Sequence, residues 1–225
     1  TAEENCGWAA VLVFDGWGWM ATLAEEEQFR RRIDDARAAL AQALPDVAPY
    51  RRLGLVIYGP GPAAPCSNVS VQRMPTVRAD QVILADISGV EPEGDTPLTQ
   101  AVDTAAGVLL AEDGAGVVVL ITDGRETCGD PCALAAQYRG QIMVHVIGFK
   151  IAENFERWPG FSAEQGELKR EPARCLADQT GGLLVLTETV EELVDALRET
   201  LGCAVVGTVR PTPLGRDVRG ENQRG

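Results

Sequence analysis

Two aspartates and one threonine stand where oxygen ligands for a metal ion would be expected. Asp15 ends an apolar run, and Asp123 closely follows a second apolar run at residues 117–121. Thr96 stands directly before Pro97, which predicts a helix start with Thr96 as its cap. Carboxylates and a hydroxyl are hard oxygen ligands suited to Mg²⁺, Mn²⁺ or Ca²⁺. The alternative is that each aspartate only caps the helix that follows its strand.

Apolar runs alternate with amphipathic segments along the chain. The predicted strands cover residues 8–14, 53–58, 69–73, 117–121, 142–149 and 183–186. The predicted helices cover residues 22–44, 79–87, 97–109, 133–138, 171–180 and 190–201, of which residues 79–87 are either a short helix or an ordered loop. Pro45 and Pro49 are expected to end the first helix, and the glycines at 181 and 182 are expected to stop the fifth. This alternation predicts an α/β fold with a doubly wound, mostly parallel sheet and helices on both faces.

In such a sheet the ligand sits at the carboxyl ends of the strands, at the point where the winding reverses. We call this part of the molecule the carboxyl edge. If the strands that lead to Asp15 and Asp123 are neighbours, both carboxylates face one crevice there, and Thr96 adds a hydroxyl.

Length and charge limit the function classes. The chain has 225 residues and a formal net charge of −13, and its length suits one large domain, expected at residues 1–203. Residues 204–225 shift towards Pro, Gly and Arg and are expected to be a tail, a linker or the start of a further domain. The acidic balance argues against nucleic acid, whose phosphates bind Lys and Arg. No apolar run is long enough to span a bilayer, so membrane insertion is not expected.

No catalytic set is recognisable in the sequence. The single histidine, His145, lies in a predicted strand and is expected to be a buried core residue. The chain is therefore not expected to be an enzyme. The alternative is a divalent-metal hydrolase that uses Asp15 and Asp123.

Three stretches resemble the von Willebrand factor A-type domain. They are Val13-Phe-Asp-Gly-Trp-Gly-Trp-Met20, Gly94-Asp-Thr-Pro-Leu98 and Leu120-Ile-Thr-Asp-Gly-Arg-Glu-Thr-Cys-Gly-Asp-Pro-Cys132. The resemblance runs from about Trp8 to Cys203 and looks like a bacterial, exported branch of the family. It implies a six-stranded sheet in the order 3-2-1-4-5-6 with strand 3 antiparallel. It also implies a metal-ion-dependent adhesion site, the D-x-S-x-S…T…D set, whose metal completes its shell with an acidic side chain of a partner protein.

The sequence departs from this set at two positions. Asp15, Thr96 and Asp123 match it, but Trp17 and Trp19 stand where the two serines are expected. An indole has one N–H donor and no acceptor, so it cannot ligate a cation. We therefore expect no cofactor and at most weak binding of Mg²⁺, Mn²⁺ or Ca²⁺. The tryptophans either face the partner as a stacking surface or fold into the emptied metal pocket.

The six cysteines are expected to form disulfides rather than a zinc site, because zinc sites usually pair two C-x2-C turns or add histidine. Cys6 and Cys203 flank the domain at ends that this architecture brings together, so they are the first expected pair. The other four leave two sets open: Cys132–Cys175 with Cys66–Cys128, which is preferred, or Cys128–Cys132 with Cys66–Cys175. The preference rests on Cys132 and Cys175, which lie near the starts of neighbouring helices on one face. Disulfides indicate an oxidising compartment, either the periplasm or the extracellular space.

The expected function is that of a non-enzymatic adhesion-type domain. The resemblance implies that it binds another protein through the carboxyl edge, which is the top face of the domain. The alternative is a scaffold or assembly module of a larger exported protein.

Overall fold

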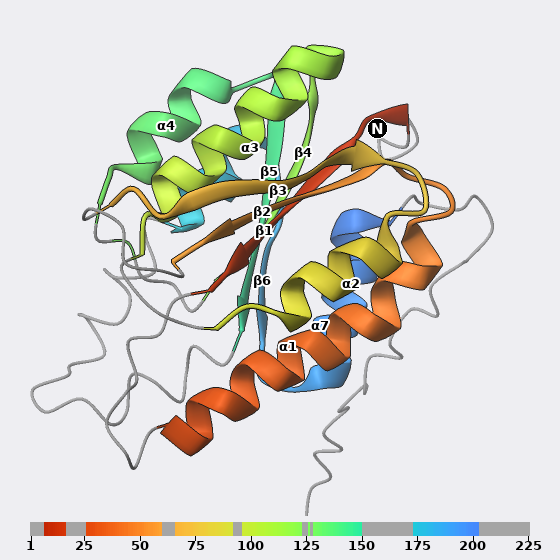
Figure 1. The fold of residues 1–225 in the computed structure, drawn as a ribbon. Coiled ribbons are helices and arrows are strands. Elements are labelled where there is room, and N and C mark those ends of the chain that lie inside the picture. Colours follow the sequence, from red (N-terminus) through yellow and green to blue (C-terminus); the bar gives the residue numbers. More distant parts are fainter. Residues whose placement is uncertain are drawn as a thin grey trace, which may run out of the picture.

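A computed structural model describes residues 7–16, 26–59, 66–91, 96–122, 126, 128–149 and 173–202, and only the backbone of residues 26–31. The described strands form one sheet in the order β3-β2-β1-β4-β5-β6 (Figure 1). They are β1 Ala10–Asp15, β2 Leu53–Tyr58, β3 Val69–Thr76, β4 Gly116–Thr122, β5 Ile142–Phe149 and β6 Leu184–Thr187. β3 runs antiparallel to β2, and all other neighbouring strands are parallel. The predicted strand order and the antiparallel strand 3 are confirmed.

Helices cover both faces of this sheet, also as predicted. They are α1 Glu26–Val47, α2 Asp80–Ser88, α3 Leu98–Asp113, α4 Pro131–Tyr138 and α7 Val190–Leu201, and residues 173–180 are helical as well. One face packs against α1, α2 and α7, and the other against α3, α4 and the 173–180 helix (Figure 1). Alternate side chains of β1 enter the two cores, Leu12 and Phe14 on one side and Val11 and Val13 on the other. β1 is continuously apolar because both of its faces are buried.

The first helix does not end at Pro45, contrary to the prediction. α1 continues to Val47 with Pro45 inside it, and the Ala48 N–H still donates to the Leu44 carbonyl at 2.9 Å. Proline removes one helical hydrogen bond and crowds the preceding turn. Leu44 and Val47 are both buried in the core. Their burial outweighs that local cost, so tertiary packing extends the helix.

The edge strand β3 is longer and less regular than predicted. It spans Val69–Thr76, the side chains of residues 70–74 are all exposed, and its pairing with β2 contains register shifts. An irregular edge strand loses the two-residue alternation that a regular half-buried strand shows. Pro75 is the buried member, and a Cβ added at Gly54 of β2 would lie 3.2 Å from its side chain.

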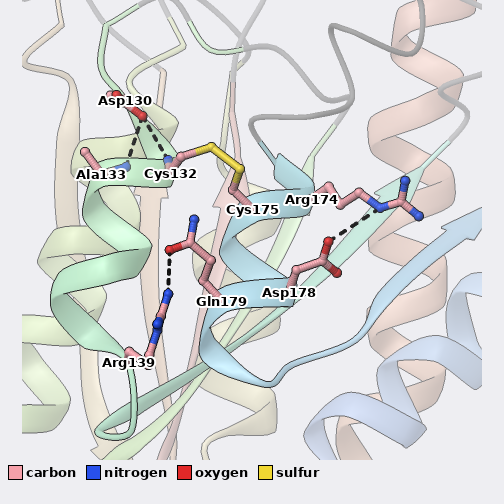
Figure 2. Close-up of a disulfide and its surroundings, with 8 residues drawn as sticks. All are labelled: Asp130, Cys132, Ala133, Arg139, Arg174, Cys175, Asp178 and Gln179. Atoms are coloured by element: carbon pink, nitrogen blue, oxygen red, sulfur yellow. Dashed lines mark hydrogen bonds and ion pairs between the residues drawn. A yellow bond between two sulfur atoms is a disulfide. The ribbon is translucent and has the colours of Figure 1, made fainter.

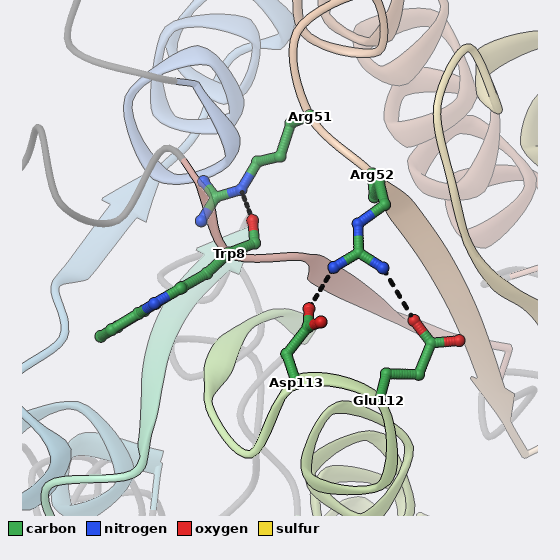
Figure 3. A network of polar contacts seen from close by, with 5 residues as sticks. All are labelled: Trp8, Arg51, Arg52, Glu112 and Asp113. Carbon is green, nitrogen blue, oxygen red and sulfur yellow. Dashed lines mark hydrogen bonds and ion pairs between the residues drawn. The ribbon is translucent and has the colours of Figure 1, made fainter.

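A buried arginine joins the segments that flank the domain. Arg51 donates from Nε to the Trp8 carbonyl at 3.1 Å (Figure 3). It also donates from Nη1 to the Leu201 carbonyl at 2.9 Å. Burial lowers the pKa of Arg51 to about 10, which still leaves it charged at neutral pH. Trp8 precedes β1, and Leu201 ends α7. Cys6 and Cys203 are each two residues from these contacts in the chain but lie outside the described residues, so their pairing stays a prediction.

His145 is a buried core residue, as predicted. Its side chain is 8% exposed, and Nδ1 accepts a hydrogen bond from the Leu183 N–H at 2.9 Å. Burial, followed by the positive charge of Arg51, lowers the pKa of His145 to about 4, against an opposing effect of Glu199. The imidazole is therefore neutral at pH 7 and serves as a fixed acceptor between β5 and the start of β6.

Candidate functional site

The carboxyl ends of β1, β2 and β4 lie side by side, as predicted. Asp15 ends β1, and the N–H of Gly16 donates to the Tyr58 carbonyl at the end of β2 at 2.8 Å. Thr122 ends β4, and the buried Tyr58 hydroxyl donates to its hydroxyl at 3.4 Å. Asp123 follows Thr122 directly but lies outside the described residues, so its predicted approach to Asp15 stays a prediction.

Thr96 is fully buried, but it is not the helix cap that the sequence predicted. α3 begins at Leu98, and its N-cap is Pro97, which makes no side-chain cap hydrogen bond. The ψ of Pro97 is 57°, outside the helical region, so the helix starts one residue later than expected. The cap position therefore falls on a residue without a polar side chain.

Glu126, which is distant from α3 in the sequence, supplies the side-chain cap that Pro97 cannot give this helix. Its carboxylate accepts hydrogen bonds from the N–H of Thr99 at 2.5 Å, from the Thr99 hydroxyl, and from the N–H of Cys128 at 2.5 Å. Thr99 is the second residue of α3, where the backbone N–H has no partner within the helix. The helix dipole also favours a negative charge there. The sequence gives no local signal for this cap, because Glu126 and Thr99 are 27 positions apart and share no local motif.

Two disulfides tie down the segments around the carboxyl edge. Cys66–Cys128 joins the residues that precede β3 to those that follow β4, with 5.4 Å between the two Cα atoms. Cys132–Cys175 joins α4 to the 173–180 helix, with a corresponding distance of 5.0 Å (Figure 2). These are the pairings preferred from the sequence, and the alternative set is wrong. In the described part of the chain, no cysteine is free.

The start of α4 is fixed by its own cap as well. The Asp130 carboxylate accepts hydrogen bonds from the N–H groups of Cys132 and Ala133, each at 3.0 Å (Figure 2). α4 therefore begins at Pro131, two residues earlier than the predicted start at 133. At its other end Arg139 donates to the Gln179 side chain at 3.2 Å, a second link between α4 and the 173–180 helix.

Only two residues of the expected metal-ligand set lie in the part of the chain that the structure describes. Asp15 and Thr96 lie in the described structure, whereas Trp17, Trp19 and Asp123 lie outside it. Indoles offer no acceptor for a cation at positions 17 and 19. Within the described residues, no group of three or more His, Cys, Asp or Glu side chains could hold a metal ion.

Comparison with known proteins identifies the fold. No protein-family model matches the sequence. The chain is 29% identical over 161 residues to the uncharacterised protein YwmD of Bacillus subtilis (strain 168), covering 66% of this chain and 70% of YwmD. Among solved structures it is similar to the von Willebrand factor type A structure from Catenulispora acidiphila, with a TM-score of 0.62. That match covers 86% of this chain and 42% of the other, at 16% identity. The chain has the von Willebrand factor A fold.

Other proteins with the von Willebrand factor A fold include an adhesin. The pilus adhesin SpaC from Lactobacillus rhamnosus GG matches with a TM-score of 0.59 at 12% identity, over 86% of this chain and 29% of SpaC. At such low sequence identity, these structural matches show the fold alone, which is the fold that the three sequence stretches predicted. In the part of the chain that the structure describes, no helix is long and apolar enough to cross a membrane.

Proposed function

We propose that this von Willebrand factor A domain is a non-enzymatic module that binds another protein at its carboxyl edge. The observation that carries the proposal is that disulfides and hydrogen bonds hold the carboxyl edge in one geometry. Two disulfides and the Glu126 carboxylate connect the residues before β3, the start of α3, the segment after β4 and the 173–180 helix. A surface held in one geometry before binding loses less conformational entropy on association. The same fold in a pilus adhesin supports the proposal.

The chemistry of the histidine also favours binding over catalysis. His145 is buried, its Nδ1 accepts a backbone hydrogen bond, and it lies in β5 away from Asp15. It is therefore not placed to act as a general base at the carboxyl edge. Disulfides persist mainly in oxidising compartments, and the two disulfides support the proposal that the domain acts in the periplasm or outside the cell.

The proposal includes an impaired cation site. Tryptophans stand at the two positions where serine hydroxyl ligands are expected, which leaves Asp15, Thr96 and Asp123 as an incomplete ligand set. Trp17 and Trp19 take over part of the partner contact in this proposal, since indoles are strong anchors in protein interfaces.

Calorimetric titration of the chain with Mg²⁺ tests the impaired site. We expect no measurable heat for the natural sequence, whereas the double variant Trp17→Ser/Trp19→Ser, which regains two oxygen ligands, should give measurable heat of Mg²⁺ binding. A micromolar dissociation constant for the natural sequence would contradict the impaired site.

Capture of a partner tests the binding function. The full chain is immobilised and exposed to the secreted and envelope proteins of its source, and bound proteins are identified by mass spectrometry. We expect a specific protein whose recovery falls about tenfold or more with Trp17→Ala/Trp19→Ala and is unaffected by EDTA. Tyr50→Ala is the matched control, because Tyr50 is an aromatic residue that is 77% exposed and follows α1. If the tryptophan and Tyr50 variants recover that protein equally, the carboxyl edge is not the binding surface.

A further inference from the structure

Glu126 connects the two chain segments that carry the predicted site residues. Its three hydrogen bonds reach Thr99, which lies three residues after Thr96, and Cys128, which belongs to the segment after Asp123. One carboxylate oxygen, Oε2, accepts both bonds from Thr99, and the other, Oε1, accepts the bond from Cys128. The side chain thus bridges the start of α3 and the segment that follows β4.

These two segments also lie unusually close at a second point, where the backbone of Gly129 packs against the side chain of Thr99. A Cβ added at Gly129 would lie 2.6 Å from the Cβ of Thr99 and 2.8 Å from its Oγ1. These distances are shorter than any normal contact, so only glycine lets the segment lie against Thr99. Glu126 and Gly129 therefore contact the same residue of α3 from either side of Cys128.

The disulfide adds a covalent restraint at the centre of this contact. Cys128 stands between Glu126 and Gly129 in the chain and is bonded to Cys66. Asp130, which follows Gly129 in the chain, is the N-cap of α4. Every described residue from 128 to 130, together with Glu126, is thus held by a hydrogen bond, a disulfide or a close steric contact.

We propose that Glu126 is a positioning residue, which holds the Thr96 segment and the segment after Asp123 together at the carboxyl edge without any cation. The carboxyl edge is then preformed before a partner arrives. The contribution of Glu126 to binding rests on the proposed function, whereas its bridging of the two segments does not.

Amide hydrogen exchange of the full chain, measured by NMR with EDTA present and without partner, tests the bridge. In Glu126→Ala we expect the protection of the Thr99 and Cys128 amides to fall about tenfold or more, because both lose a charged acceptor. Protection in the centres of β1 and β4 should stay within about twofold of the natural sequence. Glu126→Gln keeps one acceptor oxygen and should restore protection to only one of the two amides.

Glu112→Ala is the matched control, because Glu112 is a carboxylate at the opposite end of the same helix. It should leave the Thr99 and Cys128 amides unchanged. If Glu126→Ala does not fold, Glu126→Gln alone decides the question through the unequal effect on the two amides. Unchanged protection of both amides, or an equal loss throughout the sheet, would overturn the proposal.

The capture experiment separates this inference from the proposed function. If a partner is found, Glu126→Ala should lower its recovery and Glu112→Ala should not, and equal recovery would overturn the role of Glu126 in binding. If no partner is found, the proposed function fails, and the exchange data still decide whether Glu126 bridges the two segments.

Discussion

Replacing Arg51 with methionine is expected to lower the free energy of unfolding by about 3 kcal/mol. The variant loses two charged hydrogen bonds and leaves the carbonyls of Trp8 and Leu201 without these donors. Part of that loss is offset, because the burial that lowers the pKa of Arg51 to about 10 also disfavours its charge in the natural protein. Urea unfolding at pH 7 measures the difference.

The neighbouring arginine provides the control. Arg52 donates to Glu112 at 3.1 Å and also to Asp113, but its side chain is 35% exposed (Figure 3). Solvent screens such pairs, so Arg52→Met should cost less than about 1 kcal/mol. Equal losses in the two variants would show that Arg51 is not a key link between the ends of the domain.

Acidification from pH 6.5 to pH 4 is expected to remove about 3 kcal/mol of stability through His145 alone, because its pKa falls from the ordinary 6.5 to about 4 on folding. Between these two values the unfolded chain binds a proton that the folded chain does not. The contribution is therefore fully present above pH 6.5 and is lost as the pH falls towards the folded-state pKa. Protonation would also remove the Nδ1 acceptor of the Leu183 N–H.

The comparison with His145→Gln isolates this effect. Glutamine offers an acceptor for the Leu183 N–H but does not titrate. The carboxylates of the chain contribute equally to the pH dependence of stability in both proteins. Urea unfolding curves of the two proteins at several pH values should converge as the pH falls from 6.5 to 4. Parallel pH profiles would contradict the depressed pKa of His145.

Much of the fold could be predicted from the apolar pattern. β2 and β5 have the predicted bounds, because strands buried on both faces are apolar from end to end. α7 was equally clear, since its apolar residues repeat at helical spacing, and the structure adds a capping box of Thr189 and Glu192 at its start. The convergence of Asp15 and Thr122 at one edge follows from the same pattern, because neighbouring parallel strands end together.

The errors lie where packing opposes a local preference. α1 continues through Pro45 because the next turn is buried, and β3 is irregular because it is an edge strand with shifted pairing. Thr96 was predicted to cap α3, yet the backbone of Pro97 delays the helix by one residue. For α1 and β3, packing against segments distant in sequence changed the balance, and a local motif does not include those segments. For α3, the cause is the backbone conformation of Pro97 itself.

The sequence by itself determined the fold class, the chain positions of the candidate site and the absence of acceptor side chains at Trp17 and Trp19. The strand order was implied by the resemblance to the von Willebrand factor A-type domain, and the structure confirms it. Only the tertiary structure decided which cysteines pair, that Glu126 caps α3, and that Arg51 reaches the end of α7, 150 residues away in the chain. The physical reason is the range of the interactions. Burial of a helix or strand face makes apolar residues recur at a short, regular spacing in the local sequence. Hydrogen bonds and disulfides between distant segments impose no such period, because any compatible donor, acceptor or thiol can form them once the fold brings the segments together.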